Sequence, residues 1–183
     1  MTGKPRKERK KEGVAVPGKI QQGRDLKVDG DGECAEVASI QVLLIDDHEI
    51  ARRSIRSVLS RQADLDVICE TADGEEAVKR AEELHPTIIL LDITLPGISG
   101  IQAARQIRVV SPNSRIIFLS QHDSIQTAKD ALSVGAHGYV VKSDAGRDLL
   151  PAIAAVYEGR TFISRTLAAR GWSFEEPPVQ YPA

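Results

Sequence analysis

The stretch Thr87-Ile88-Ile89-Leu90-Leu91-Asp92-Ile93-Thr94-Leu95-Pro96-Gly97 decides how the rest of the sequence is interpreted. A run of apolar and β-branched residues ends on a carboxylate, and a Pro-Gly turn follows. Such a short apolar run is typical of a strand that is buried on both faces, as parallel sheets require. Asp92 would then lie at the carboxyl end of the strand, where open α/β sheets bind their ligands. A lone Asp after a strand is more often a cap or a turn residue, so its neighbours must decide its role.

Predicted strands and helices alternate on both sides of this stretch. The strands are expected at residues 40–45, 66–72, 87–91, 115–120 and 138–141, and the helices at 48–62, about 77–84, 99–110, 124–134 and 144–157. This alternation predicts an α/β domain with a parallel sheet and right-handed crossovers, and it leaves several doubly wound topologies open. Pro151 falls inside the last predicted helix, either at a kink or in the first turn of a helix that begins later.

Polar residues follow four of the predicted strands: Asp46 and Asp47, then Asp92, Ser120 and Lys142. In a doubly wound sheet these strand ends share one edge, so the five side chains should converge. Three neighbouring carboxylates raise one another's pKa unless a cation neutralises them, and oxygen ligands suit Mg²⁺ or Mn²⁺. An Asp beside such an ion can form an acyl phosphate, while an ammonium and a hydroxyl stabilise the transferring phosphoryl oxygens.

This set of residues resembles the receiver domain of bacterial two-component response regulators. The likeness covers about residues 40–160. It rests on Asp46-Asp47, Asp73-Gly74-Glu75-Glu76-Ala77, Leu91 to Gly97, Ser120, Gly135 to Tyr139 and Val141-Lys142. The resemblance implies a flavodoxin-like, doubly wound five-stranded parallel sheet with strand order 2-1-3-4-5 and five helices. It further implies a phosphoprotein in signal transduction.

The resemblance assigns the chemistry to particular residues. Asp92 would be the phosphoacceptor, and Lys142 would contact the phosphoryl group. Asp47 and Asp92 would bind Mg²⁺ directly together with the carbonyl oxygen of Thr94, and Asp46 would bind it through water. Mn²⁺ is the alternative ion.

The resemblance also implies a conformational switch. Ser120 would follow the phosphoryl group and leave room for Tyr139 to rotate inward. Thr94, Gln121 and His122 would tune the lifetime of the phosphate. Gln121 departs from the small residue that the family often has there, and it could crowd access to the phosphoacceptor.

The two ends of the sequence suggest little globular structure. Residues 1–39 are rich in Lys, Arg and Gly and lack apolar periodicity, which predicts a disordered basic tail. Residues 161–183 resemble the linker that follows the receiver in LuxR-type regulators, but are too short for the helix-turn-helix output domain. We therefore expect a stand-alone receiver that signals through a protein partner, without sequence-specific DNA binding.

The expected partners are a sensor histidine kinase or phosphotransfer protein and a downstream protein, with a homodimer implied by resemblance only. The chain should be no enzyme beyond its own phosphorylation and dephosphorylation. Two alternatives remain open, a phosphate sink and a phosphorylation-independent binding module. A DNA-binding regulator that uses the basic arm is less favoured. A haloacid-dehalogenase-type phosphatase is disfavoured because Thr94 stands where that family needs a second Asp.

We expect the chain to be cytoplasmic. The charged fraction is 27%, and no apolar run is long enough to span a bilayer. The basic N-terminus lacks the apolar segment of a secretory signal. Cys34 and Cys69 show no metal-ligand spacing, which suits free thiols in a reducing compartment. The four histidines suggest no further site.

Overall fold

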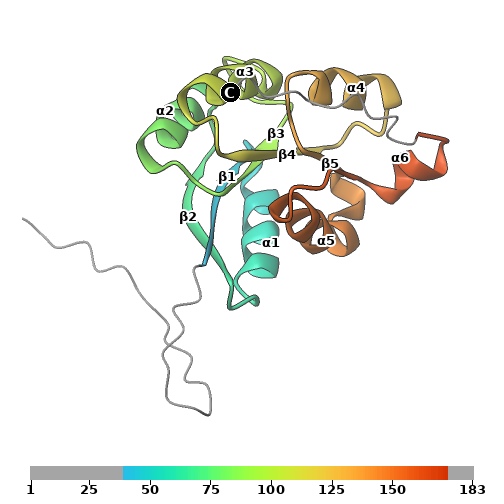
Figure 1. Cartoon of the computed structure of the whole chain (residues 1–183), viewed down its shortest axis with the longest axis horizontal. Helices are drawn as coiled ribbons and strands as arrows, with labels where there is room; N and C mark the ends of the chain where they lie inside the picture. Colours follow the sequence, from blue (N-terminus) through green and yellow to red (C-terminus); the bar gives the residue numbers. More distant parts are fainter. Residues whose placement is uncertain (1–38, 173–183) are drawn as a thin grey trace, which may run out of the picture. The chain divides into compact units, whose positions relative to one another are not determined.

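Strands and helices alternate throughout the described part of the chain, residues 39–172 of a computed structural model (Figure 1). The strands are β1 (Ile40–Ile45), β2 (Leu65–Thr71), β3 (Ile88–Asp92), β4 (Arg115–Ser120), β5 (Gly138–Val141) and β6 (Phe162–Ile163). The helices are α1 (Glu49–Leu59), α2 (Gly74–Leu84), α3 (Gly100–Val110), α4 (Ile125–Ser133), α5 (Ala145–Tyr157) and α6 (Arg165–Ala169), and a 3₁₀ turn, η1 (Lys142–Asp144), precedes α5.

The six strands form one sheet in the order β2-β1-β3-β4-β5-β6, and each neighbouring pair is parallel. This confirms the predicted class and the order 2-1-3-4-5 of the first five strands. The prediction of five strands and five helices is corrected by β6 and α6, which continue the fold after α5.

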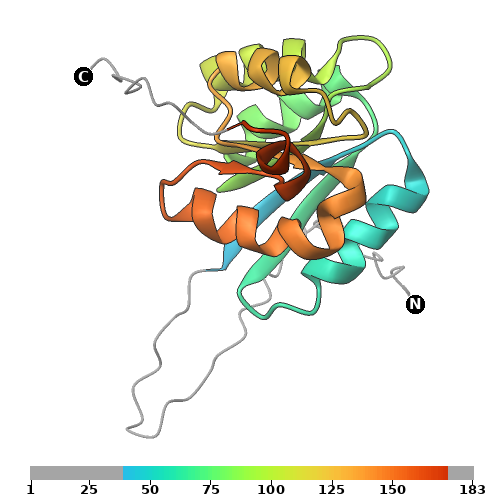
Figure 2. The same ribbon diagram turned by 90° about the vertical axis from the view of Figure 1, so that its right-hand side faces the viewer.

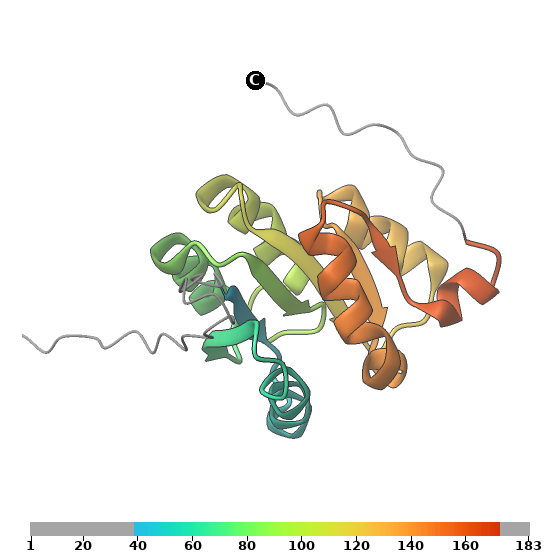
Figure 3. The ribbon, with the colours of Figure 1, turned by 60° about the horizontal axis from the view of Figure 1, so that its bottom comes forward.

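The sheet is buried on both faces because apolar residues occupy successive positions along its strands. In β1, Leu43 and Ile45 belong to one core and Val42 and Leu44 to the other. Small and branched residues of α2, α3 and α4 complete the first core, and those of α1 and α5 complete the second. Figure 3 shows α5 lying across the sheet, with β6 and α6 beyond it.

The predicted helix ends have identifiable causes. Ser99 forms a capping box with Gln102 at the start of α3, and Asp73 accepts hydrogen bonds from two amides at the start of α2. Gly135, predicted to stop α4, has φ +87°, a conformation that glycine adopts without strain. Pro151 lies well inside α5, so the alternative that placed it in the first turn is wrong.

Residues 162–172, which follow the predicted boundary at residue 160, pack onto the domain. The amide of Ser164 donates to the carbonyl of Tyr139 at 2.9 Å, which adds β6 to the sheet edge. Leu167 in α6 is fully buried, and Trp172 packs against the same core. These contacts connect residues distant in sequence. Most of the tail predicted over 1–39, and residues 173–183 of the one predicted over 161–183, lie outside the described residues.

Two minor expectations concern composition. Cys69 is a free thiol, and Cys34 lies outside the described residues. Within residues 39–172, no helix is long and apolar enough to cross a membrane.

A half-buried imidazole stabilises the turn that leads into β5. His137 Nδ1 accepts a hydrogen bond from the amide of Ile116 at 3.3 Å, which requires a neutral ring. Burial, together with the charges of the Arg108 and Arg115 guanidinium groups, lowers the pKa of His137 to about 4. The folded state therefore disfavours protonation of this residue.

We expect the free energy of unfolding to decrease as the pH is lowered from about 6.5 to about 4. A base whose pKa is lowered by folding contributes fully to stability at pH values above its pKa in the unfolded chain. This contribution is lost as the pH falls, because the unfolded chain takes up the proton more readily than the folded one. The change attributable to His137 should be about 3 kcal/mol. Urea unfolding of wild type and His137→Asn at several pH values would measure it. Parallel pH profiles for the two proteins would contradict this assignment.

Candidate functional site

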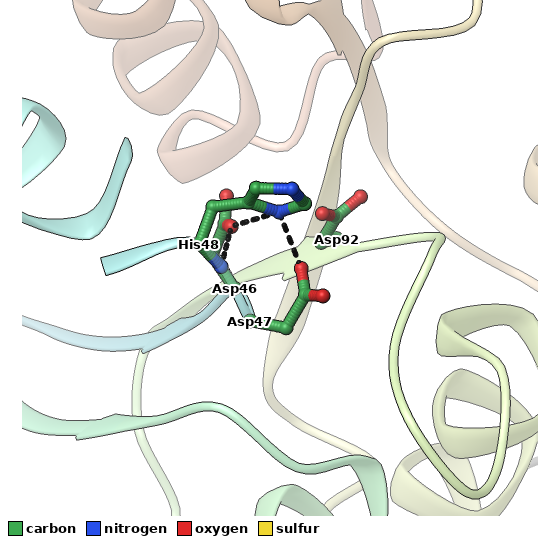
Figure 4. A group of neighbouring side chains, drawn as sticks. All are labelled: Asp46, Asp47, His48 and Asp92. Atoms are coloured by element: carbon green, nitrogen blue, oxygen red, sulfur yellow. Dashed lines mark hydrogen bonds and ion pairs between the residues drawn. The ribbon is translucent and has the colours of Figure 1, made fainter. Parts of the chain in front are cut away.

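The acidic residues predicted at the strand ends do converge. Asp46 and Asp47 directly follow β1, and Asp92 is the last residue of β3, the neighbouring strand. Ligand atoms of these three carboxylates and of His48 all lie within 4.8 Å of one another, and Figure 4 shows the four side chains grouped together. Asp46 and Asp92 are buried, whereas Asp47 and His48 face solvent.

Lys142 supplies the positive charge that this cluster needs. It begins η1, directly after β5, and its Nζ lies 2.6 Å from Oδ2 of Asp46 and 2.6 Å from Oδ2 of Asp92. Burial disfavours the ammonium, yet hydrogen bonds to the two carboxylates outweigh it and raise the pKa of Lys142. The lysine therefore stays charged between two buried acids.

Asp92 is held on both of its oxygens. Oδ1 accepts a hydrogen bond from the amide of Thr94 at 3.1 Å, and Oδ2 accepts one from Lys142. Burial raises the pKa of Asp92 above its usual value, although the hydrogen bond and the charge of Lys142 act in the opposite direction. The backbone is fixed as well, since a Cβ on Gly100 would lie 1.9 Å from the carbonyl oxygen of Asp92. Sequence reasoning did not identify this glycine as part of the site.

His48 is a second residue that sequence reasoning missed. Its Nδ1 lies 2.6 Å from Oδ1 of Asp47 and 3.6 Å from Oδ1 of Asp46, and its amide donates to Asp46 at 2.9 Å. The prediction that the histidines form no further site did not include His48 in this one, and these contacts place it there. Its position directly after the acidic pair was the available signal, but only the side-chain orientation shows the contact.

The predicted switch residues are adjacent in space. Ser120 is fully buried at the end of β4, and its Oγ accepts a hydrogen bond from the amide of His122 at 3.0 Å. The hydroxyl of Tyr139 donates to the carbonyl of His122 at 2.8 Å. Tyr139 is fully buried, which raises the pKa of its phenol. The ring of Tyr139 therefore lies inside the core, next to the loop that follows Ser120.

A cavity of about 240 Å³ opens above Asp92. It is lined by His48, Asp92, Thr94, Gln121 and His122, so all three residues predicted to tune phosphate lifetime border the phosphoacceptor candidate. A second cavity of about 350 Å³, formed mainly by residues of β1, α5 and the start of β2, contains none of the predicted site residues.

The donor set of the cluster fits a hard divalent cation. Carboxylate oxygens at the mouth of a cavity, with room for water, are the ligands that Mg²⁺ and Mn²⁺ prefer. Asp47 and His48 are exposed, so an ion could reach the cluster from solvent. The two buried acids, Asp46 and Asp92, are held in position by Lys142.

Comparisons with known proteins agree with this geometry. Residues 42–154 match the response regulator receiver domain family. The chain is 34% identical over 122 residues to response regulator protein VraR of Staphylococcus saprophyticus, which covers 67% of this chain and 58% of VraR. It is 35% identical over 129 residues to response regulator UvrY of Escherichia coli strain K12, which covers 70% of this chain and 59% of UvrY. The chain thus spans less than three fifths of these curated relatives.

Solved structures give the same result. A two-component response regulator of the LuxR family from Aurantimonas sp. SI85-9A1 superposes with a TM-score of 0.69 at 37% identity. The superposition covers 72% of this chain and 94% of that one. The likeness therefore extends over nearly the whole of the solved chain.

We expect Lys142→Met to destabilise the fold by about 3 kcal/mol at pH 7 in the presence of a chelator, because two buried carboxylates lose their counter-charge. Lowering the pH to about 5 should reduce the deficit, since protonation removes the repulsion. Replacing Asp92 with Asn in the same variant should also reduce it. Urea unfolding measures these effects, with the exposed Lys129→Met as the control. Equal stability of the two lysine variants would contradict the predicted role of Lys142.

Proposed function

We propose, from the premise that this chain belongs to the response regulator receiver domain family, that Asp92 accepts a phosphoryl group in two-component signalling. The observation that carries the proposal is the pairing of a buried carboxylate with a partly buried ammonium at the mouth of a cavity. Asp92 Oδ2 and Lys142 Nζ are 2.6 Å apart, and the cavity gives a phosphodonor access to Asp92.

The proposed reaction is a phosphoryl transfer from a phosphohistidine. A carboxylate oxygen of Asp92 attacks phosphorus, an O–P bond forms, and the N–P bond to the donor imidazole breaks. The imidazole leaves with the electron pair and takes up a proton from solvent. Lys142 neutralises charge on the phosphoryl oxygens, because its ammonium stays protonated and already contacts the acceptor. Hydrolysis of the acyl phosphate would return the chain to its starting state.

A divalent cation would be held by Asp46, Asp47 and Asp92, with the carbonyl of Thr94 as a further oxygen ligand. When bound, it would supply Lewis-acid stabilisation of the negative charge on the phosphoryl group. The protein's own contribution is a preorganised set of acids: Lys142 and the amide of Thr94 hold Asp92, and His48 holds Asp47.

The response to phosphorylation would begin at Ser120. A phosphoryl group adds charge and acceptor oxygens, and the hydroxyl of Ser120 is a donor one strand away. Drawing Ser120 toward Asp92 would disturb the amide of His122, which now donates to the Ser120 hydroxyl, and through it the hydrogen bond from Tyr139. Thr94, Gln121 and His122 line the route of an attacking water and would set the lifetime of the phosphate.

The chain would act as a switch and not as an enzyme on other substrates. The expected donor is a sensor histidine kinase or a phosphotransfer protein, and the expected output is a change in protein–protein contacts. The likeness to response regulators over residues 42–154 supports this assignment.

We expect one added phosphoryl group on the wild-type chain after incubation with phosphoramidate and Mg²⁺, and none on Asp92→Asn. Intact-protein mass spectrometry measures the added mass. Omitting Mg²⁺, or replacing it with a chelator, should abolish the addition. Asp130→Asn, which alters an exposed carboxylate of α4, serves as the matched control and should be phosphorylated like wild type. Phosphate on Asp92→Asn, or none on wild type, would refute the proposal.

A further inference from the structure

Residues 162–172, which comprise β6, α6 and Trp172, are here called the strap. In Figure 2, α6 lies between α4 and α5, and Figure 1 shows the same arrangement. Leu167 is fully buried in the core that contains Tyr139, and Trp172 packs against that core. These two residues of the strap therefore contribute to the core in which Tyr139 lies.

The start of the strap is anchored by two buried carboxylates. The hydroxyl of Ser164 lies 2.8 Å from Asp144 Oδ2 and 3.0 Å from Asp148 Oδ2. The amides of Arg165 and Thr166 donate to Asp148 and Asp144 at 2.9 and 3.3 Å. Hydrogen bonds from Thr166 and Ser164 lower the pKa of Asp144, although burial opposes them. Both acids lie in the chain segment that follows β5.

This anchor is mechanically close to the phosphorylation site. Asp144 ends the three-residue turn η1 that Lys142 begins, and Lys142 contacts Asp92. The amide of Ser164 also donates to the carbonyl of Tyr139. A movement of Lys142 would therefore displace Asp144, which binds the strap, and a movement of Tyr139 would displace the carbonyl to which Ser164 donates.

The far end of the strap holds the loop between β4 and α4. Arg170 donates to the main-chain carbonyl of Asp123 at 2.7 Å and also pairs with its carboxylate. Asp123 follows His122, whose amide donates to Ser120 and whose carbonyl accepts from Tyr139. The loop that follows Ser120, and that is hydrogen-bonded to its hydroxyl, is thus tied to the strap.

We propose that the strap holds this loop in its present position, and that strap docking and phosphorylation of Asp92 oppose each other. The proposal rests on the proposed function. Moving Ser120 toward a phosphoryl group draws Asp123 away from Arg170, so the modified state binds the strap less tightly. Coupling of this kind is reciprocal. If phosphorylation weakens docking of the strap by some factor, undocking the strap must favour the phosphorylated state by the same factor. The strap therefore binds the loop between β4 and α4 when Asp92 is not phosphorylated.

The first test needs no phosphate. In Arg170→Ala, amide hydrogen exchange of the peptide containing residues 120–124 should be two- to fivefold faster, as the loss of a partly exposed pair allows. Trp172, the only tryptophan of the chain, should shift its emission to longer wavelength. Arg160→Ala is the matched control, since Arg160 pairs with Glu158 in the turn before β6. Unchanged exchange in Arg170→Ala would overturn the proposal.

The second test uses beryllium fluoride with Mg²⁺ as the phosphoryl analogue. Calorimetry should give two- to fivefold tighter binding to Arg170→Ala than to wild type or Arg160→Ala, and saturation should shift the Trp172 emission of wild type. Mass spectrometry after treatment with phosphoramidate reports separately whether Asp92 is phosphorylated. Equal affinities in all three proteins would overturn the coupling. A chain that takes up no phosphate in the presence of Mg²⁺ would fail the proposed function, while the exchange test still decides whether the strap holds the loop.

Discussion

The ammonium group of Lys142 lies between two buried carboxylates, and the fold depends on this contact. Asp46 and Asp92 are withdrawn from water at the end of an apolar sheet, and Lys142 contacts both. Burying two like charges is unfavourable unless a counter-charge with good geometry accompanies them. The strand order satisfies this condition because it places the end of β1 beside that of β3, and η1 brings Lys142 back over both.

Much of this arrangement could be predicted from the sequence. Fully buried strands are continuous apolar runs, so β4 and β5 begin and end where the runs from Arg115 and Gly138 do. In a parallel sheet the carboxyl ends of all strands lie at the same edge. The sequence therefore predicted that the polar residues at these ends, Asp46, Asp92 and Lys142, lie close together. Strand order needed the family resemblance, because periodicity carries no information on which strands are neighbours.

The missed features depend on contacts that no local pattern records. β6 is two residues long, too short for alternation to be visible, and it is held by backbone hydrogen bonds to β5. Ser164 resembles an ordinary helix cap, while Asp144 and Asp148, which hold it, lie 20 and 16 residues earlier. The orientation of His48 toward Asp47 is set by its rotamer. Likewise, the inward position of Tyr139 is fixed by a contact of its hydroxyl with the carbonyl of His122, 17 residues earlier.

The short strand β6 also determines where this domain can be divided. A receiver cut after residue 160 would lose the partner of Gly138 and Tyr139 and leave the edge of β5 unpaired, with its peptide groups available to another chain. It would also remove the side chain of Leu167 from the core. Chimaeras that graft this receiver onto a foreign output module should therefore join after Trp172, so that the sheet edge remains covered and the fused protein stays monodisperse.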